Sequence, residues 1–315
     1  MDSTIQKAST AAGRAVVDGV VQWRRVRVTY DTLPDDTRPG ARVAIECDHP
    51  PAGTPPMLLA LGFALATVTA ADMHVDRLRP GTSTYLVYHH GPAGSGIRRA
   101  TLATSTITRE RVDGADAWVI EQRWEGESGV VHTARTVHAA DDLATLSQTA
   151  TWSRPDGAFT TTVVPAEGKG TVEGELPAER REAAERGFAT MRDGWWLNWH
   201  SDLALLPLLP YERGGTLRVH LFDVGMPAPM DVDYTVVGER TLVGGDGSTR
   251  YDCWLVETES GMAGSGNYQR FWIDKARRVV VKEEDIYNGQ YRAKVLLGVP
   301  AVVEFALPAG GDGAR

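Results

Sequence analysis

Three short runs of β-branched and aromatic residues in the second half of the chain constrain its fold most. They span residues 252–257, 268–274 and 278–283, and a Gly-rich turn and a charged turn separate them. Valine, isoleucine, tyrosine, phenylalanine and tryptophan favour strands, and short turns join antiparallel neighbours. The runs therefore predict an antiparallel meander, and hence a mainly β domain around it.

The same alternation extends over most of the chain. Between residues 84 and 173, apolar and polar positions alternate, and turn signals recur about every 10–15 residues. Trp118, Ile120 and Trp124 are expected on one face of their strand. After residue 215 the pattern resumes, and it predicts strands over 216–223, 232–237, 251–258, 268–273, 278–283, 290–297 and 302–306.

Residues 177–199 interrupt the alternation. Pro177 suits the first position of a helix, and four apolar residues follow at helical spacing as one stripe: Ala184, Phe188, Met191 and Trp195. Gly187 lies within this helix and costs about 1 kcal/mol relative to alanine, so packing must hold the stripe in place. We predict a mainly β (α+β) fold, in which a curved antiparallel half-barrel sheet wraps around this one main amphipathic helix.

Residues 57–71 are uncharged, apolar and alanine-rich, and they end in small residues before Asp72. A membrane span needs about 20 residues, so the segment fits better as the core of a signal peptide. We expect an exported, periplasmic protein that truly starts at Met57 and whose mature chain begins near Ala71 or Asp72. The alternatives are a cytoplasmic protein that buries the segment as a core helix and an N-anchored membrane protein.

These patterns divide the chain into four parts. Residues 1–56 form a poorly patterned N-terminal extension with one strand-like stretch at 20–30, and residues 57–71 are the signal-like segment. Residues 72–306 are expected to form the half-barrel domain, and residues 307–315 a flexible tail.

Composition excludes several classes of function. The net charge of −8 and the pI near 5.5 argue against a nucleic-acid partner, whose phosphates require a basic face. Two cysteines, Cys47 and Cys253, cannot form a disulfide framework, and nothing in the sequence pairs them. No cofactor is predicted.

Candidate catalytic and metal-binding groups are sparse. His200-Ser201-Asp202 places three hydrolase residue types side by side, but triads assemble in space, so we interpret the triplet as a cap of the Leu-rich segment after it. His132 and His138 lie six residues apart on one strand and can face the same side. Without cysteines or carboxylates nearby they do not predict a metal site. The acidic run 283–285 is interpreted as a solvated strand end.

Several short runs give the chain a familiar pattern. A Leu/Pro run at 205–210 leads to Gly214-Gly215, and the runs 237–239, 253–257 and 271–274 follow. The chain has strands, one helix that ends in several tryptophans, and these runs. This order resembles exported half-barrel proteins of the LolA/LolB-like superfamily, including uncharacterised periplasmic families. The resemblance covers residues 72–306. It implies a strongly bent antiparallel sheet around an apolar cavity; members usually bind lipids or lipidated chains, but one relative in pigment biosynthesis is an enzyme.

The ligand-binding candidates are tryptophans at the C-terminal end of the predicted helix and leucines that follow them. Trp195, Trp196 and Trp199 lie within five residues and cannot all face the core from one helix. Leu205 and Leu208 add apolar surface beside them. Apolar pockets are lined by such residues, so these five are the predicted ligand wall.

The predicted function is that of an exported, non-enzymatic carrier or binding protein. Its ligand would be an apolar small molecule or lipid, and an envelope protein is a further expected partner. One alternative is an enzyme that acts on a hydrophobic small molecule in the same cavity, with His200 and Asp202 at its mouth. The other is a structural envelope protein whose core is filled.

Overall fold

The computed structural model describes residues 9–17, 20–28, 65–90, 97–155, 157–192, 194–223, 226–259, 267–287, 290–298 and 301–302. The chain divides into two compact units, Met1–Leu61 and Gly62–Arg315. In the first unit, β1 (Ser9–Val17) pairs antiparallel with β2 (Val20–Val28), which coincides with the strand-like stretch predicted at 20–30.

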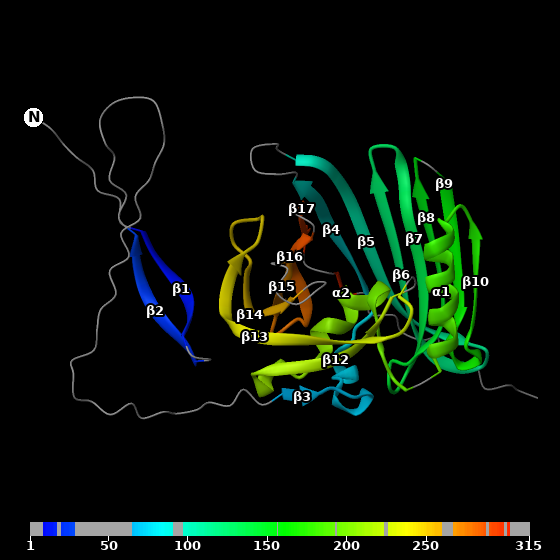
Figure 1. The fold of residues 1–315 in the computed structure, drawn as a ribbon, viewed down its shortest axis with the longest axis horizontal. Coiled ribbons are helices and arrows are strands. Elements are labelled where there is room, and N and C mark those ends of the chain that lie inside the picture. The colour runs from blue at the N-terminus through cyan, green and yellow to red at the C-terminus, as the bar shows by residue number, and fades with distance from the viewer. Residues whose placement is uncertain are drawn as a thin grey trace, which may run out of the picture. The chain divides into compact units, whose positions relative to one another are not determined.

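Within the described part of the second unit, sixteen strands form one open, curved sheet (Figure 1). Its N-terminal half is a meander of seven strands: β4 (Gly81–His90), β5 (Ile97–Val112), β6 (Ala115–Gly126), β7 (Gly129–Ala139), β8 (Thr145–Arg154), β9 (Gly157–Val164) and β10 (Lys169–Gly174). Its C-terminal half is a second meander: β12 (Thr216–Phe222), β13 (Met230–Val243), β14 (Arg250–Glu259), β15 (Tyr268–Asp274), β16 (Val279–Tyr287) and β17 (Gln290–Leu296).

The two meanders join at the first and last long strands. β17 pairs antiparallel with β4, from Tyr291↔His90 to Leu296↔Tyr85. Three short strands complete the sheet: β3 (Leu65–Thr67) and β11 (Leu197–Asn198) run parallel to β12, and β18 (Ala301–Val302) pairs with β4. The sheet is therefore mixed, although all of its long neighbours are antiparallel.

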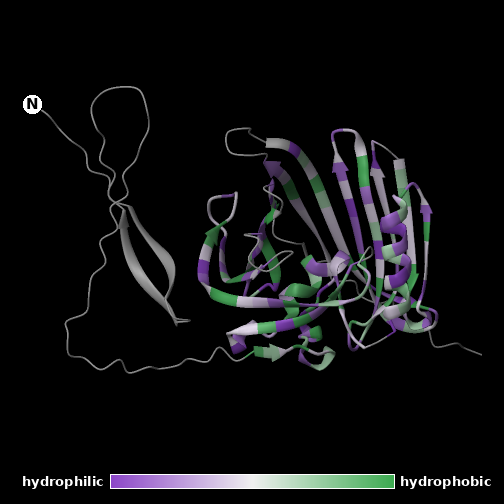
Figure 2. Ribbon diagram, in the orientation of Figure 1, coloured by the Kyte–Doolittle hydropathy of each residue, from purple (hydrophilic) through white to green (hydrophobic). Residues whose placement is uncertain are grey.

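Local sequence explains the meander. Figure 2 shows polar and apolar residues alternating along the strands, as expected for a sheet with one packed face. Trp118, Ile120 and Trp124 are all buried on the concave face, as predicted. Between β5 and β6, Asp113 and Gly114 have φ of 51° and 83°, the two positive values that a type I′ hairpin requires.

A short apolar stretch, not the main helix, occupies the curve of the sheet. We call residues 197–213 the inner segment; it contains β11, η4 (Trp199–Ser201), α2 (Asp202–Leu205), η5 (Leu206–Leu208) and η6 (Tyr211–Arg213). Its leucines share one buried core with side chains from both meanders, such as Val87, Ile120 and Val256. In Figure 1, α2 lies between the two halves of the sheet.

The main helix, α1 (Ala178–Thr190), lies at the β10 end of the sheet (Figure 1). The predicted wrapping of the sheet around this helix is not confirmed. Ala184, Phe188 and Met191 are buried as predicted, but in a separate core with Trp196 and Phe222. The helix is also shorter than predicted: it ends at Thr190 with Met191 as its C-cap residue, and Gly194 has a left-handed φ of 85° three residues later.

Gly187 explains how α1 docks. A Cβ at this position would meet the Met226 backbone oxygen at 2.2 Å and the Phe222 ring at 3.1 Å. Only glycine permits this approach, so the helix propensity lost here is exchanged for close packing. Arg181 then donates to the carbonyl oxygens of Val172 and Gly174 on β10, which covers part of the free edge of the sheet.

Part of the signal-like segment lies within the described residues. β3 pairs with β12, Val68 is buried, and the Val68 N–H donates to the Arg218 carbonyl oxygen at 2.8 Å. Three further short helices are of the 3-10 type: η1 (Ala70–Asp72), η2 (Val75–Arg77) and η3 (Pro165–Glu167). No helix among the described residues has the length and apolar character needed to cross a membrane.

The two cysteines differ in what the structure shows. Cys253 is a buried free thiol, and burial raises its pKa to about 12. This agrees with an inert core residue, since a reactive cysteine needs an accessible thiolate. Cys47 lies outside the described residues, so the predicted absence of a bridge stays a prediction.

Candidate functional site

The triplet His200-Ser201-Asp202 sits where the inner segment crosses the concave face, and its three side chains diverge. The Ser201 hydroxyl lies 2.8 Å from His138 Nε2, whereas Asp202 Oδ2 lies 3.9 Å from Lys294 Nζ. Asp202 Oδ1 also accepts the N–H of the next residue, Leu203, at 2.6 Å, but the N-cap residue of α2 is Ser201 and its side chain makes no cap bond. The three residues therefore do not act on one another.

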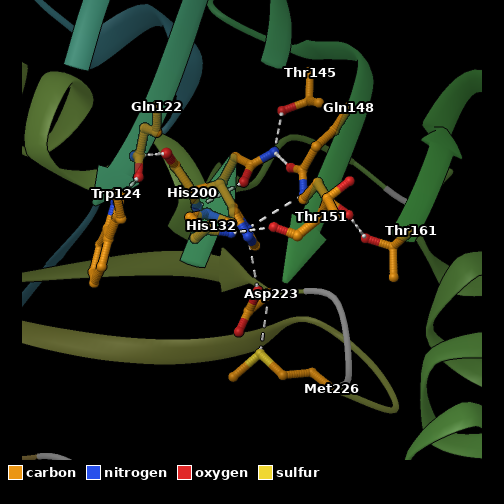
Figure 3. A network of polar contacts seen from close by, with 12 residues as sticks. Gln122, Trp124, His132, Thr145, Gln148, Thr151, Thr161, His200, Asp223 and Met226 are labelled. Carbon is orange, nitrogen blue, oxygen red and sulfur yellow. Dashed lines mark hydrogen bonds and ion pairs between the residues drawn. The ribbon is translucent and has the colours of Figure 1, made fainter. Parts of the chain in front are cut away.

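Neutral amides and imidazoles surround His200, as Figure 3 shows. We call this group the amide–imidazole cluster, and it comprises Gln122, His132, Gln148, Asn198 and His200. All five residues are buried. Asn198 Oδ1 accepts the His200 N–H at 2.9 Å, Asn198 Nδ2 donates to Gln148 Oε1 at 2.6 Å, and Gln122 Nε2 donates to the His200 carbonyl oxygen. These bonds tie β6 and β8 to the inner segment.

The His200 ring is only partly satisfied. Its Nδ1 lies 3.3 Å from Gln148 Nε2 and 3.4 Å from Asp223 Oδ1, the latter without hydrogen-bond geometry. Its Nε2 is buried and has no hydrogen-bond partner. Buried polar atoms are nearly always paired, and His200 Nε2 is one of six buried side-chain atoms among the described residues that are not.

Aromatic rings enclose this imidazole. Trp199 meets His200 edge-on at a centroid distance of 5.3 Å, and the His132 ring lies 5.4 Å away. His132 in turn stacks on Trp152 at 3.7 Å, with an angle of 20° between the planes. The Trp124 indole donates to Gln122 Oε1 at 3.1 Å. Trp152 and Trp199 are half-buried, so this aromatic wall reaches the solvent.

The two strand histidines are held neutral. Burial, followed by the neighbouring His200, lowers the pKa of His132 to about 3, although the Thr151 carbonyl opposes the shift. Burial lowers the pKa of His138 to about 4, against the effect of the Leu143 carbonyl. In each neutral ring Nδ1–H donates to that carbonyl oxygen, at 2.9 and 3.0 Å, and Nε2 remains an acceptor. His138 Nε2 therefore accepts a hydrogen bond from the Ser201 hydroxyl.

A second cluster on the other half of the sheet is ionic. We call it the charged cluster; it comprises Asp202, Glu283, Asp285, Arg292 and Lys294. Lys294 Nζ lies 2.7 Å from Glu283 Oε2, Arg292 Nη2 lies 3.1 Å from Glu283 Oε1, and Arg292 also pairs with Asp285. The interpretation of run 283–285 as a solvated strand end is wrong, because Glu283 is 1 % and Asp285 is 7 % exposed.

Burial dominates the titration of the charged cluster. It raises the pKa of Asp202 and of Asp285, against the attraction of Lys294 and Arg292 respectively. Burial, then the Asp202 and Glu283 charges, also raises the pKa of Tyr85 beside them. Three carboxylates face two cations here, so the raised carboxyl pKa values reduce the excess of negative charge.

Both clusters lie within a region that matches a known family. Residues 84–295 match the family described as "Protein of unknown function (DUF3108)". The chain belongs to this family. No curated protein matches the chain.

Two solved structures are similar to the chain at 12% identity. One is a beta-barrel-like protein of the DUF1849 domain of unknown function from Brucella abortus, with a TM-score of 0.45, covering 70% of this chain and 96% of that one. The other is a DUF1329 family protein from Desulfovibrio piger, with a TM-score of 0.24, covering 74% and 89%. The LolA/LolB-like resemblance stays a prediction.

The five predicted ligand-wall residues of this DUF3108 protein take four different positions. Leu205 and Leu208 are fully buried in the main core, and Trp196 is buried in the α1 core, where its indole donates to the Met191 carbonyl oxygen. Trp195 is half-buried and donates to the Asp142 carbonyl oxygen. Of the five, Trp199 alone adjoins His200. Whether any of them touches a ligand stays a prediction.

Both polar clusters were missed from the sequence. Glu283 and Asp285 alternate on β16, and Lys294 and Arg292 alternate opposite them on β17. Opposite charges at every second position of two consecutive strands are therefore a usable signal for a buried ionic ladder. The amide–imidazole cluster offers no such signal. No group of three His, Cys, Asp or Glu side chains in the described ranges is arranged to hold a metal.

Proposed function

We propose that this DUF3108 protein is an exported, non-enzymatic binding protein or carrier whose curved sheet holds an apolar, lipid-like ligand. The observation that carries the proposal is the unpaired Nε2 of His200 among aromatic rings. A ligand with an apolar body and one polar group would lie against Trp152 and Trp199 and hydrogen-bond to this nitrogen. Such a pairing of apolar wall and single polar anchor is typical of small-molecule sites.

The Ser201–His138 contact supports binding over hydrolysis. It has the spacing of a nucleophile and its base, and the Leu143 carbonyl fixes the imidazole tautomer. Both side chains are nevertheless fully buried, with 0 % exposure. A substrate cannot reach them in this conformation, so the pair satisfies two buried polar groups.

Export is the second part of the proposal, and it rests on the apolar composition of residues 57–71. The contacts of β3 and Val68 set a condition on it, because cleavage near Ala71 would remove them from β12. An envelope protein that delivers or receives the ligand is the proposed partner. The intact mass of the native protein would report both the mature terminus and any co-purified lipid.

Titration with a fluorescent fatty acid, cis-parinaric acid, tests the binding proposal. We expect saturable binding to the wild type and a loss of about tenfold in affinity, or 1.4 kcal/mol, in His200→Leu and Trp199→Ala. Trp272→Ala is the matched control, because Trp272 is half-buried in a separate cluster on the opposite face. Trp196→Ala should instead cost about 3–5 kcal/mol of stability, as a core tryptophan does.

Two other outcomes would redirect the proposal. If neither fatty acid nor lipid extract binds to the wild type, a structural envelope role with a filled core is favoured. If ester or amide turnover appears and His200→Gln abolishes it, the protein is an enzyme for a hydrophobic small molecule. The contact of His200 Nδ1 with Asp223, which leaves Nε2 free, is the observation that favours this second candidate.

A further inference from the structure

A second hollow lies on the same sheet, away from the His200 site, where η2 covers the turn-proximal ends of β5 and β6. Its volume is about 420 Å³, within the size range of small-molecule pockets. It is lined by Val75, Asp76, Leu78, Arg79, Pro80, Arg109, Trp118 and Ala140. In Figure 1 the covering residues belong to the cyan segment that follows β3.

The Trp118 indole marks this hollow as a binding site. Trp118 is 5 % exposed, and its Nε1 is buried without a hydrogen-bond partner. An indole N–H can only donate, so the group that completes it must be an acceptor. Trp118 lines the hollow with the small exposed part of its side chain, so an acceptor that enters the hollow must move past that part of the ring to reach Nε1.

The charges around the hollow favour an anionic acceptor. Its lining carries two guanidinium groups, Arg79 and Arg109, and one carboxylate, Asp76. With Asp76 counted, the lining still carries one net positive charge. Arg109 lies over the Trp118 ring at 5.4 Å, so its guanidinium is held beside the unpaired indole.

The two arginines keep donors free for a ligand. Arg79 uses Nη1 alone for its recorded bonds, to the carbonyl oxygens of Asp76 at 2.5 Å and Leu78 at 2.9 Å. Besides the Trp118 ring, the contact of Arg109 within the described part of the chain is a long one with Asp116, at 3.8 Å, and the Arg109 and Asp116 side chains are about half exposed. Guanidinium groups bind carboxylates through paired N–H donors, and exposed ion pairs of this length are weak competitors.

The remaining lining is apolar. Val75, Leu78, Pro80 and the Trp118 ring offer hydrocarbon surface next to these donors. We propose that this hollow binds a small amphipathic carboxylate, with its carboxylate on Trp118 Nε1, Arg79 and Arg109 and its alkyl part on η2. Residues 75–80 precede the part of the chain that matches DUF3108, so the covering half of the site lies outside the family match.

Calorimetric titration of the full chain with sodium octanoate tests this site. We expect saturable binding that is about tenfold weaker in Trp118→Phe and in Arg109→Gln, because each removes one donor to the carboxylate. Octanol, which keeps the chain and lacks the charge, should also bind about tenfold more weakly. The matched control is Arg123→Gln, which removes the same charge from an exposed position of β6 that does not line the hollow.

A second measurement locates the binding. The indole N–H resonance that disappears in Trp118→Phe should shift when octanoate is added to the isotope-labelled wild type. Octanoate binding should be unchanged in His200→Leu, which separates this hollow from the lipid site proposed above. Equal octanoate affinity in wild type, Trp118→Phe and Arg109→Gln, loss of binding in His200→Leu, or no saturable binding would each overturn the proposal.

Discussion

The two halves of the curved sheet bury polar groups by different means. On β6 to β8, the amide–imidazole cluster combines side-chain amides with the neutral His132, and one ring nitrogen of His200 remains unpaired. On β16 and β17, the charged cluster pairs each cation with at least one carboxylate at close range. The inner segment touches both, because His200 faces the first cluster and Asp202 the second.

This difference separates a site from a support. The carboxylates and cations of the charged cluster compensate one another's charge, and breaking such a buried cluster is costly. The proposed ligand site lies in the half with His200, and we expect the half with Lys294 to contribute rigidity.

The largest expected effect comes from Lys294→Met. Removing this cation leaves Glu283 and Asp202 buried with less compensation, so we expect a loss of about 3–5 kcal/mol in the free energy of unfolding. Urea denaturation measures it, and Lys169→Met is the control, because the Lys169 side chain is 75% exposed. A loss below about 1 kcal/mol would show that the charged cluster is not a support.

Acid should weaken the fold through the histidines. The pKa of His138 is about 4 in the folded protein, and that of the unfolded chain is about 6.5. Below pH 6.5 the unfolded state therefore binds a proton that the folded state excludes. His138 alone should therefore lower the free energy of unfolding by about 1.4 kcal/mol for each pH unit between 6.5 and 4.

His138→Gln should remove its share of this slope, measured by denaturation at several pH values. His220→Gln is the control, because His220 is 38% exposed beside Asp231. Asp202 and Asp285 act in the opposite sense. Their raised pKa values stabilise the fold below 3.8 and this contribution is lost as the pH rises, so Asp285→Asn should not flatten the histidine slope.

A smaller effect is expected from Gln148→Leu. This change removes the bond from Asn198 Nδ2 to Gln148 Oε1, which leaves that amide only a 3.4 Å bond to Thr145 Oγ1, and it removes the Gln148 amide beside His200 Nδ1. One stranded buried polar group costs about 1–3 kcal/mol. Thr149→Val, at the exposed neighbouring position of β8, serves as the comparison in thermal unfolding. If both variants melt together, the amide–imidazole cluster contributes nothing to the fold.

The smallest effect is expected from Thr136→Val. The Thr136 hydroxyl is buried without a partner on β7, so an isosteric methyl group should leave stability unchanged or raise it by up to about 1 kcal/mol. A clear loss of stability would mean that the hydroxyl has a hydrogen-bond partner of its own, such as an ordered water. The buried polar groups on this half of the sheet would then be more completely hydrogen-bonded than the protein contacts alone indicate.

Alternation predicted the sheet well, because it records which face of each strand is packed. The strands predicted at 216–223, 251–258 and 290–297 agree with β12, β14 and β17 to within one residue at each end. The helix end was misplaced, since the end of α1 at Thr190 is a tertiary choice that periodicity does not encode.

The candidate site was beyond the same reasoning. Gln122 and His200 are 78 residues apart, and Asn198 and Gln148 are 50 apart, so no local pattern brings them together. Glutamine and threonine at inward positions of β6, β7 and β8 look like interruptions of the apolar face in sequence. The charged ladder of β16 and β17 was accessible in principle, because its residues face one another across a single hairpin.

The pairing of β17 with β4 has a consequence for how the chain folds. Each meander forms from neighbouring segments, but the seam between them joins residues 85–90 to residues 291–296. Contacts of such long sequence separation form slowly, because a large loop must close first. A chain emerging from the ribosome can pair β4 with β5, but the other edge of β4 stays unpaired until β17 is synthesised. An unpaired strand edge is prone to association, so we expect the seam to govern the yield of soluble protein during refolding.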